Sequence, residues 1–232
     1  MADYSNPKEQ VILVTGAAGG LGSALTLRLC QQDCTVVALD KNPKVLNEMA
    51  DMVVAEGGLE PVIYPMDLLG AAPDDFARLA ESIGENLHHL DALVHTAVAF
   101  SGLTPFEHYE PTRWLKEMQI NVNSPVFLTQ ALLPLLKENS GRILFTGEDP
   151  QLPHKPYWGA YGMAKAGLKA FSNMLAEELE NSGVTVETIV PPPMHTRHRA
   201  KAWPAEDPAS LASPLEVAEL YLQKLNCLPM AK

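Results

Sequence analysis

The chain of 232 residues has few cysteines, little positive charge and no long apolar run. Its three cysteines, Cys30, Cys34 and Cys227, are odd in number and lack metal-ligand spacing, so we expect free thiols and no metal site. With 17 Lys and Arg against 28 Asp and Glu, the net charge of -11 argues against a nucleic-acid partner, which needs clustered cations. The one short cationic cluster, residues 195–201, is expected to be a mobile loop.

The sequence contains no stretch of 18 apolar residues, and its first ten residues are polar, without the apolar centre of a secretory signal. We therefore expect no membrane partner and a cytoplasmic location. With 47% hydrophobic residues, the chain has enough apolar side chains to bury a core. Its length fits a single domain over residues 1–232.

Short β-branched runs alternate with helix-length segments, and this alternation is typical of βαβ units in a parallel sheet. Strands are expected near residues 11–15, 34–39, 61–65, 91–96, 142–146 and 184–190. Helices are expected near residues 20–32, 43–56, 73–87, 111–138, 158–182 and 214–226. Right-handed crossovers then predict an α/β fold of the Rossmann type, a doubly wound parallel sheet with strand order 3-2-1-4-5-6.

The segment from Pro191 to Pro214 holds six prolines, too many for the interior of a helix. It follows the last expected strand, and ligands bind at the carboxyl edge of such sheets. A loop of this length in a compact domain is usually a lid or a binding segment, so we expect residues 191–213 to cover the substrate. Met194 and Trp203 suggest a partly apolar pocket beneath it. A disordered excursion is the alternative.

A glycine-rich turn at residues 15–22 follows the apolar run 11–14 and precedes an amphipathic helical pattern. Glycines also form ordinary turns, but a strand before this turn and a helix after it predict a phosphate-binding loop. Gly16 would permit the sharp turn, Gly20 the close approach of a pyrophosphate, and Gly22 the packing of helix on strand. The phosphates would lie at the helix N-terminus, where unpaired amides and the helix dipole favour anions.

Asp40 ends the next expected strand, where a carboxylate that binds the adenosine ribose hydroxyls is expected. Such a carboxylate repels the 2′-phosphate of NADP, so we expect the cofactor NAD, with NADP less favoured. The neighbouring Lys41 weakens this preference. The alternative for Asp40 is a helix N-cap.

Tyr161 and Lys165 lie four residues apart in a helical pattern, so both side chains share one helix face. Carbonyl reduction needs a group that protonates the developing alkoxide, and a free tyrosine, with a pKa of about 10, needs a nearby cation to favour its phenolate. Lys165 would supply that cation. The pair is common by chance, but together with the glycine loop it predicts a hydride-transfer site.

These motifs resemble those of the classical short-chain dehydrogenase/reductase family over essentially the whole chain. The resemblance implies hydride transfer between NAD(H) and a small alcohol or carbonyl substrate. It implies that Tyr161 is the acid/base and that Lys165 shifts the pKa of Tyr161 and binds the ribose. It also implies that Asn121 holds a water in a proton relay. Three stretches are especially similar to the YciK-type subgroup of this family, namely residues 119–123, 128–136 and 158–161.

The resemblance also implies a set of cofactor contacts and an assembly. Asp67 corresponds to the family's adenine-contacting Asp, and Thr196 to the Thr that contacts the carboxamide. The expected cofactor-binding residues are Gly16, Ala18, Gly20, Leu21, Gly22, Asp40, Asp67, Leu68, Tyr161, Lys165 and Thr196. In the family, two long helices pair with their copies, which implies a homodimer. The apolar positions expected to serve that interface are Leu128, Leu132, Leu136, Leu168, Phe171 and Leu175.

The most consequential departure from the family is Glu148, which stands thirteen residues before Tyr161 at the position of a serine. Losing one donor to an oxyanion costs about 10²–10³ in rate. An ionised Glu148 about 4 Å from the developing alkoxide would add about 4 kcal/mol of repulsion at an effective dielectric of 20. A protonated Glu148 would instead donate the missing hydrogen bond. A third alternative is that Glu148 turns outward and does nothing.

Two other motifs and the C-terminus also depart from the family. The Asn-Asn-Ala-Gly turn after the fourth strand reads His95-Thr96-Ala97-Val98, and the Pro-Gly after the sixth reads Pro191-Pro192. The sequence stops before the family's usual seventh strand. Two interpretations follow. The chain is either an oxidoreductase with impaired or specialised catalysis, or a family member kept as a nucleotide-binding or interaction protein with little turnover.

Overall fold

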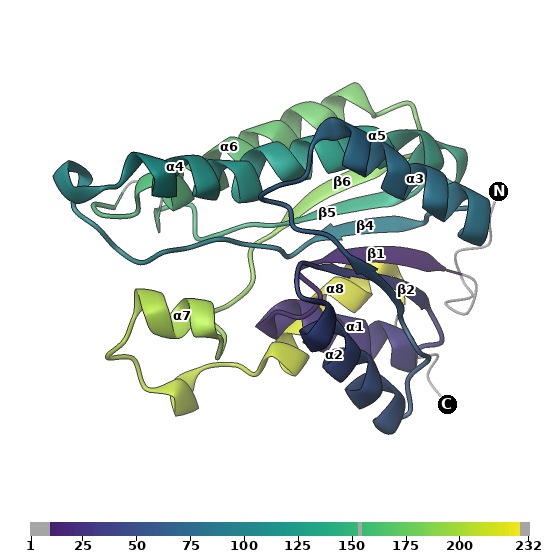
Figure 1. The fold of residues 1–232 in the computed structure, drawn as a ribbon, viewed down its shortest axis with the longest axis horizontal. Coiled ribbons are helices and arrows are strands. Elements are labelled where there is room, and N and C mark those ends of the chain that lie inside the picture. The colour runs from purple at the N-terminus through teal and green to yellow at the C-terminus, as the bar shows by residue number, and fades with distance from the viewer. Residues whose placement is uncertain (1–9, 153–154, 228–232) are drawn as a thin grey trace.

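A six-stranded parallel sheet lies at the centre of the fold (Figure 1). The computed structural model describes residues 10–152 and 155–227. The strands are β1 (Val11–Thr15), β2 (Thr35–Asp40), β3 (Val62–Pro65), β4 (Ala92–His95), β5 (Arg142–Thr146) and β6 (Thr185–Ile189). Their order is β3-β2-β1-β4-β5-β6 and every neighbouring pair is parallel, which confirms the predicted topology. The strand order reverses between β1 and β4, where ligands bind in such sheets.

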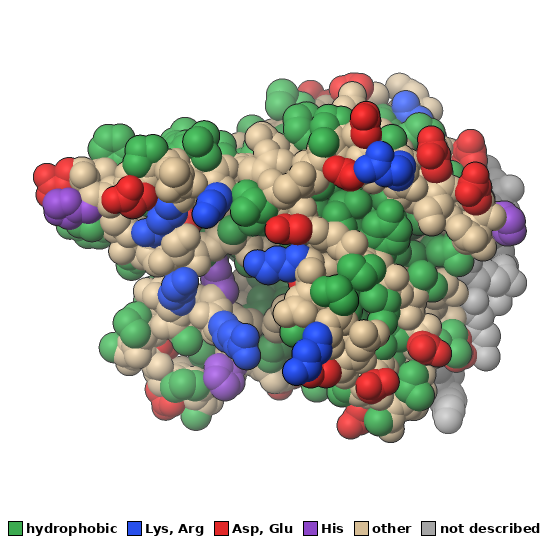
Figure 2. Space-filling model, viewed as in Figure 1, with side chains coloured by type: hydrophobic (Ala, Val, Ile, Leu, Met, Phe, Trp, Pro, Cys, Tyr) green, Lys and Arg blue, Asp and Glu red, His purple; other side chains and the backbone are tan. Residues whose placement is uncertain are grey.

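Helices cover both faces of this sheet (Figure 1). They are α1 (Gly20–Gln31), α2 (Pro43–Ala55), α3 (Pro73–Leu87), α4 (Pro111–Met118), α5 (Ser124–Glu138), α6 (Gly159–Glu178), α7 (Arg197–Ala202) and α8 (Pro214–Leu225). One layer holds α1, α2 and α8, and the other holds α3, α5 and α6. The molecule is hollowed beside α7, where Lys, Arg and His side chains surround the opening (Figure 2).

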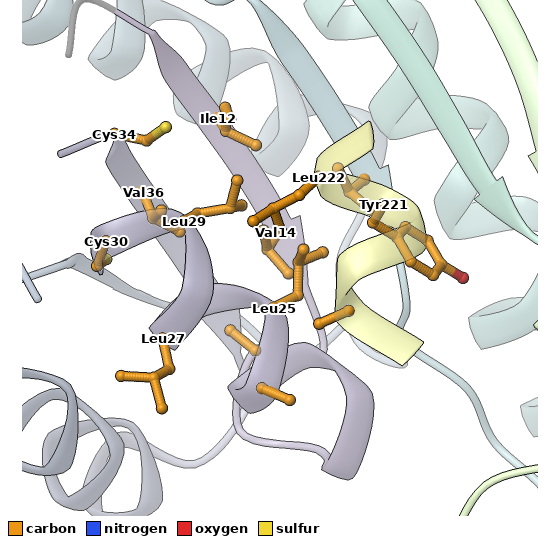
Figure 3. Close-up of a cluster of buried hydrophobic side chains, with 14 of the residues drawn as sticks. Ile12, Val14, Leu25, Leu27, Leu29, Cys30, Cys34, Val36, Tyr221 and Leu222 are labelled. Carbon is orange, nitrogen blue, oxygen red and sulfur yellow. The ribbon is translucent and has the colours of Figure 1, made fainter. Parts of the chain in front are cut away.

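The side chains of β1 alternate between the two layers, so this strand is buried along its whole length. Ile12 and Val14 pack with Leu25 and Leu29 of α1 and with Leu222 of α8 (Figure 3). Burying each such side chain contributes about 1.5–3 kcal/mol. This packing fixes α1 against β1, and the glycine loop that joins them is held at the carboxyl edge of the sheet.

The single helix expected near residues 111–138 is interrupted in the structure. A π-helical turn, Gln119–Asn123, separates α4 from α5. Pro125 lacks an N–H, so it cannot donate to the carbonyl of Asn121 in the α-helical pattern. A π-turn accommodates such a break, and turns of this kind are frequent at functional sites.

The apolar positions expected to serve a dimer interface are mostly buried within the chain. Leu128, Leu132, Leu136, Leu168 and Leu175 belong to the core between the sheet and the helices α3, α5 and α6, and Phe171 packs against that core. They are needed for the sheet face because β4 and β5 present apolar side chains to both layers. The exposed apolar side chains of α4 and α6 are instead Leu115, Met163 and Met174.

The segment after β6 is folded, and part of the cationic cluster 195–201 is the helix α7 rather than a loop. Thr196 caps α7, and its Oγ1 accepts a hydrogen bond from the Arg199 backbone N at 3.1 Å. The Arg199 guanidinium donates to both carboxylate oxygens of Glu206 at 2.5 and 2.6 Å and lies 3.5 Å from the Trp203 ring centroid. The prolines flank α7 and do not enter it, so they do not prevent the helix.

The polar first residues, apart from Gln10, lie outside the part of the chain that the structure describes. In residues 10–152 and 155–227, no helix combines the length and apolar character needed to span a bilayer. Cys30, Cys34 and Cys227 are free and buried. The sulfur atoms of Cys34 and Cys227 lie 3.7 Å apart.

Candidate functional site

A cleft of about 810 Å³ lies at the carboxyl edge of the sheet, in the hollow that Figure 2 shows beside α7. It brings together all the predicted cofactor-binding residues: Gly16, Ala18, Gly20, Leu21, Gly22, Asp40, Asp67, Leu68, Tyr161, Lys165 and Thr196. Glu148 lines the same cleft, whereas Asn121 does not. Residues far apart in the sequence meet here because parallel strands all end at the same edge.

At two positions of the glycine loop, at one end of the cleft, there is no room for a side chain. Gly16 has a φ of +66°, and a Cβ built there would lie 2.7 Å from the Ala97 Cα. A Cβ on Gly22 would lie 2.1 Å from the Gly16 carbonyl oxygen. The N-cap of α1, Gly19, offers no side chain to the amides of the first turn. This loop therefore fits the pyrophosphate of a dinucleotide, which would bind the open helix N-terminus.

Asp40 lies beside that loop at the end of β2. Its carboxylate accepts hydrogen bonds from the backbone N of Ala18 at 3.2 Å and of Lys41 at 2.7 Å. The N-cap of α2 is Asn42, whose Oδ1 accepts from the Lys44 backbone N at 3.1 Å. Asp40 is thus not a helix cap, and its carboxylate faces the cleft where a ribose next to the pyrophosphate would lie.

The segment after β3 and the lid complete the cofactor end of the cleft. Asp67 Oδ1 accepts a hydrogen bond from the Leu69 backbone N at 3.1 Å, and the Leu68 carbonyl accepts from Ser124 Oγ at 2.7 Å. On the opposite side, a Cβ on Gly20 would lie 2.9 Å from Thr196 Cγ2. The start of α7 therefore rests directly on the glycine loop.

Tyr161 and Glu148 form a direct hydrogen bond in the catalytic half of the cleft. The Tyr161 hydroxyl, on the first turn of α6, donates to Glu148 Oε2 at 2.7 Å. Glu148 Oε1 accepts from the Asp149 backbone N at 3.1 Å. Glu148 is half-buried and points into the site, so the outward-facing alternative is wrong. The carboxyl group lies next to the Tyr161 hydroxyl.

The protonation equilibrium of Tyr161 is shifted opposite to the expected direction. Burial raises the pKa of this phenol above its ordinary value, and the charge and hydrogen bond of Glu148 raise it further. The Lys165 ammonium lies 5.6 Å from the centre of the Tyr161 ring and donates instead to the Thr146 carbonyl at 2.7 Å. Burial lowers the pKa of Lys165 to about 8, while the charge of Glu148 opposes that shift. Burial and Glu148 are therefore the causes of the Tyr161 shift, and the Lys165 ammonium does not reverse it.

Two hydroxyl groups near the site serve the fold. Thr146, which lies one pleat deeper than Glu148, shares a hydrogen bond of 2.9 Å with the Tyr221 hydroxyl of α8. Thr96 Oγ1 donates to the Thr15 carbonyl at 2.6 Å and joins the ends of β4 and β1. Each hydroxyl is held by a structural partner, so neither replaces the serine.

His95, at the family's first Asn position, is likewise a core residue. Its Nε2 lies 2.9 Å from Thr129 Oγ1, and its ring stacks on Phe145 with centroids 4.8 Å apart. Burial lowers the pKa of His95 to about 3, so the imidazole is neutral at physiological pH. The change from Asn to His therefore adds no charge to the site.

Asn121 lies behind the cleft and fixes the segment that follows β4. Its Oδ1 accepts from the Ala99 backbone N, and its Nδ2 donates to the Ala99 carbonyl, both at 2.7 Å. The side chain is buried and serves as a clamp.

Sequence reasoning missed an aromatic wall contributed by the lid and the segment after β4. The His198 ring of α7 lies 5.0 Å from both the Tyr161 and the Phe100 rings, and Phe100 stacks on Trp158 at 5.3 Å. Burial lowers the pKa of His198 to about 4. Its Nε2 is buried without a hydrogen-bond partner in the part of the chain that the structure describes. Thr196 as an N-cap, followed by a proline-free run, was the sequence signal for this helix.

Comparisons with known proteins agree with this geometry. The family model described as short chain dehydrogenase matches residues 10–207. The uncharacterized oxidoreductase YciK of Escherichia coli K12 is 34% identical over 215 residues, which cover 92% of this chain and 85% of that protein. A short chain dehydrogenase from Shigella flexneri solved with NADP has a TM-score of 0.89 and 34% identity, covering 93% of this chain and 90% of that one. One from Escherichia coli CFT073 solved with NADPH has a TM-score of 0.90 and 32% identity, covering 96% and 93%.

Replacing the Glu148 carboxylate by an amide is expected to lower the pKa of Tyr161, because its charge no longer disfavours the phenolate. In a spectrophotometric pH titration, one tyrosine should ionise at lower pH in Glu148→Gln than in the unaltered protein. The difference should vanish when Tyr161→Phe is added. Asp149→Asn, which removes a neighbouring exposed carboxylate, is the matched control and should leave the titration unchanged. Superimposable curves for Glu148→Gln and the unaltered protein would contradict the assignment.

Proposed function

Because the chain belongs to the short-chain dehydrogenase family, we propose that it is an oxidoreductase that transfers a hydride between a nicotinamide nucleotide and a small-molecule substrate. The observation that carries this proposal is the single cleft that joins the glycine loop to Tyr161 and Lys165. A bound nicotinamide nucleotide supplies the hydride. The chain supplies the binding surface, the proton-holding groups and the lid.

Each site residue has a role that its contacts support. Tyr161 holds a proton on its hydroxyl at the position that faces the substrate. Lys165 is a buried cation whose donation to the Thr146 carbonyl ties α6 to the end of β5. Asn121 is a positioning residue, since it holds the segment after β4 through Ala99. Burial raises the proton affinity of Tyr161, and Glu148 raises it further.

A second candidate function is a nucleotide-binding protein with little turnover. The observation that favours it is the hydrogen bond from the Tyr161 hydroxyl to Glu148 Oε2, which engages the proton donor. A carbonyl substrate would have to break this hydrogen bond before Tyr161 could protonate the substrate oxygen. The two candidates differ in whether the bound nucleotide is oxidised when substrates are added.

Asp40 supports NAD as the cofactor. Its carboxylate lies beside the glycine loop, held by the backbone of Ala18 and Lys41. A negative charge fixed there disfavours a 2′-phosphate. The relatives solved with NADP and NADPH show that similar folds take the phosphorylated nucleotide. We therefore attribute the proposed preference for NAD to Asp40 and not to the fold.

Asp40 should make NAD(H) bind more tightly than NADP(H), and Asp40→Ala should reduce the difference. The physical reason is the loss of charge repulsion with the 2′-phosphate together with the loss of an acceptor for the ribose hydroxyls. Calorimetric titration of both variants with both nucleotides measures this. Tighter binding of NADP(H) by the unaltered protein would show the assignment to be wrong.

Glu148→Ser should raise reductase activity on a reactive dicarbonyl compound by about 10²–10³-fold, the value of one oxyanion-stabilising donor. The substitution restores a hydroxyl donor and frees the Tyr161 hydroxyl. Adding Tyr161→Phe should then abolish the gain, because the proton donor is lost. If Glu148 instead acts as a neutral donor, the unaltered protein should be active mainly at low pH and Glu148→Gln should keep much of that activity. If Glu148→Ser gives no gain and the unaltered protein shows no activity at low pH, Glu148 takes no part in the reaction.

We also propose a two-fold dimer that uses the outer faces of α4 and α6. Leu115, Met163 and Met174 are exposed there by 67%, 58% and 62%. Exposed apolar side chains grouped on neighbouring helices favour an isologous contact, which covers the same patch on both subunits.

A cytoplasmic location stays a prediction. It is supported by Cys30, Cys34 and Cys227, which are free thiols in the structure. Free thiols persist in reducing compartments.

Met174→Asp should convert the dimer to a monomer, because each copy would place a carboxylate in an apolar contact. Val54→Asp is the matched control, since Val54 of α2 is 50% exposed in the other helix layer. Light scattering measures the molecular mass of both variants and of the unaltered protein. A monomeric unaltered protein would contradict the dimer.

A further inference from the structure

Glu148 places a carboxylate beside the group that faces the substrate. Its Oε2 lies 2.7 Å from the Tyr161 hydroxyl oxygen, and its side chain lines the cleft. The other oxygen, Oε1, accepts from the Asp149 backbone N. A half-buried carboxylate in this position accepts hydrogen bonds and disfavours any anion that develops next to it.

Two cationic side chains in this region, Lys165 and Arg199, hydrogen-bond to groups other than Glu148. Lys165 donates to the Thr146 carbonyl, and Arg199 of the lid pairs with Glu206. His198 is neutral at physiological pH, because burial lowers its pKa to about 4. Among the residues that the structure describes, no cation lies within ion-pair distance of Glu148. The carboxylate is therefore open to a cation supplied by the substrate.

We propose, building on the oxidoreductase function above, that the substrate is a protonated imine, a carbon–nitrogen double bond that carries an N–H and a positive charge. The substrate N–H would donate to Glu148, and the carboxylate would keep the imine in its protonated form, which is the form that accepts a hydride. A carbonyl oxygen at the same place would meet an acceptor, and its developing alkoxide would meet a negative charge. The carboxylate thus selects nitrogen over oxygen.

The reaction balances with a dihydronicotinamide nucleotide as the reductant. A hydride, with its electron pair, forms the new bond to the imine carbon. The π electron pair of the carbon–nitrogen bond becomes a lone pair on nitrogen, whose positive charge disappears. The nucleotide is oxidised to its pyridinium form and takes the positive charge. The product is an amine, which takes up a proton from water on release.

The aromatic wall beside Tyr161 suits such a substrate. Trp158 is 4% exposed, and its ring packs on Phe100 and on Trp203 of the lid at 5.3 and 5.1 Å. Excluding water strengthens a hydrogen bond between a carboxylate and a cation. It also protects a bound imine from hydrolysis, a side reaction that closed active sites prevent.

The binding test uses a stable cation. 2-Methylpyrrolidine, in its ammonium form, should bind the protein saturated with NAD or NADP, with tryptophan fluorescence as the readout. Glu148→Gln should weaken this binding by about 10- to 100-fold, the value of a hydrogen bond to a charged group. Asp149→Asn, which removes a neighbouring carboxylate outside the cleft, should not. Equal binding by the unaltered protein and Glu148→Gln would overturn the inference.

The turnover test compares 2-methyl-1-pyrroline, an imine, with cyclopentanone, a ketone of similar size. The unaltered protein should have the higher kcat/KM for the imine, and Glu148→Ser should reverse that order. Reduction of the ketone in preference to the imine by the unaltered protein would overturn this inference while supporting the proposed oxidoreductase. Failure to oxidise a bound reduced nucleotide with either compound would contradict both proposals.

Discussion

The close contact between the glycine loop and the chain after β4 determines where everything else in the site lies. A Cβ on Gly16 would lie 2.7 Å from the Ala97 Cα, and a Cβ on Gly22 only 2.1 Å from the Gly16 carbonyl oxygen. Only hydrogen atoms fit at these positions, so β1, α1 and the end of β4 converge. The Thr96 hydroxyl, bonded to the Thr15 carbonyl at 2.6 Å, closes the junction. The cleft opens directly above it.

The direction of Glu148 follows from a second tight contact, at the end of β5. The Gly147 backbone N donates to the Ile189 carbonyl at 2.7 Å, and a Cβ on Gly147 would lie 2.7 Å from Thr188 Cγ2. The backbone just before Glu148 is therefore fixed against β6. With this position set and α6 packed alongside, the Glu148 carboxylate and the Tyr161 hydroxyl come within hydrogen-bond distance. The position of this carboxylate therefore depends on the contact between Gly147 and β6.

The sheet order, the glycine loop and the places of Asp40, Tyr161 and Glu148 could be predicted from the sequence, because hydrophobic periodicity and turn residues are local signals. The π-turn depends on Pro125, whose missing N–H matters only once helical geometry is in place. The lid helix α7 is short and is held by the pairing of Arg199 with Glu206, a contact made in three dimensions. The direction in which the pKa of Tyr161 is shifted could not be predicted from the sequence, because its largest cause is burial, which depends on the folded structure.

Tyr161 retains its proton in this site. Burial disfavours the phenolate of Tyr161, and the charge and hydrogen bond of Glu148 disfavour it further. Oxidation of an alcohol requires a base that removes a proton, and a phenol whose pKa is raised supplies little phenolate at neutral pH. Reduction requires a proton on the substrate instead. A substrate that arrives already protonated meets this requirement without a proton from Tyr161. The Glu148 carboxylate can then hold the protonated substrate while Tyr161 stays a neutral phenol.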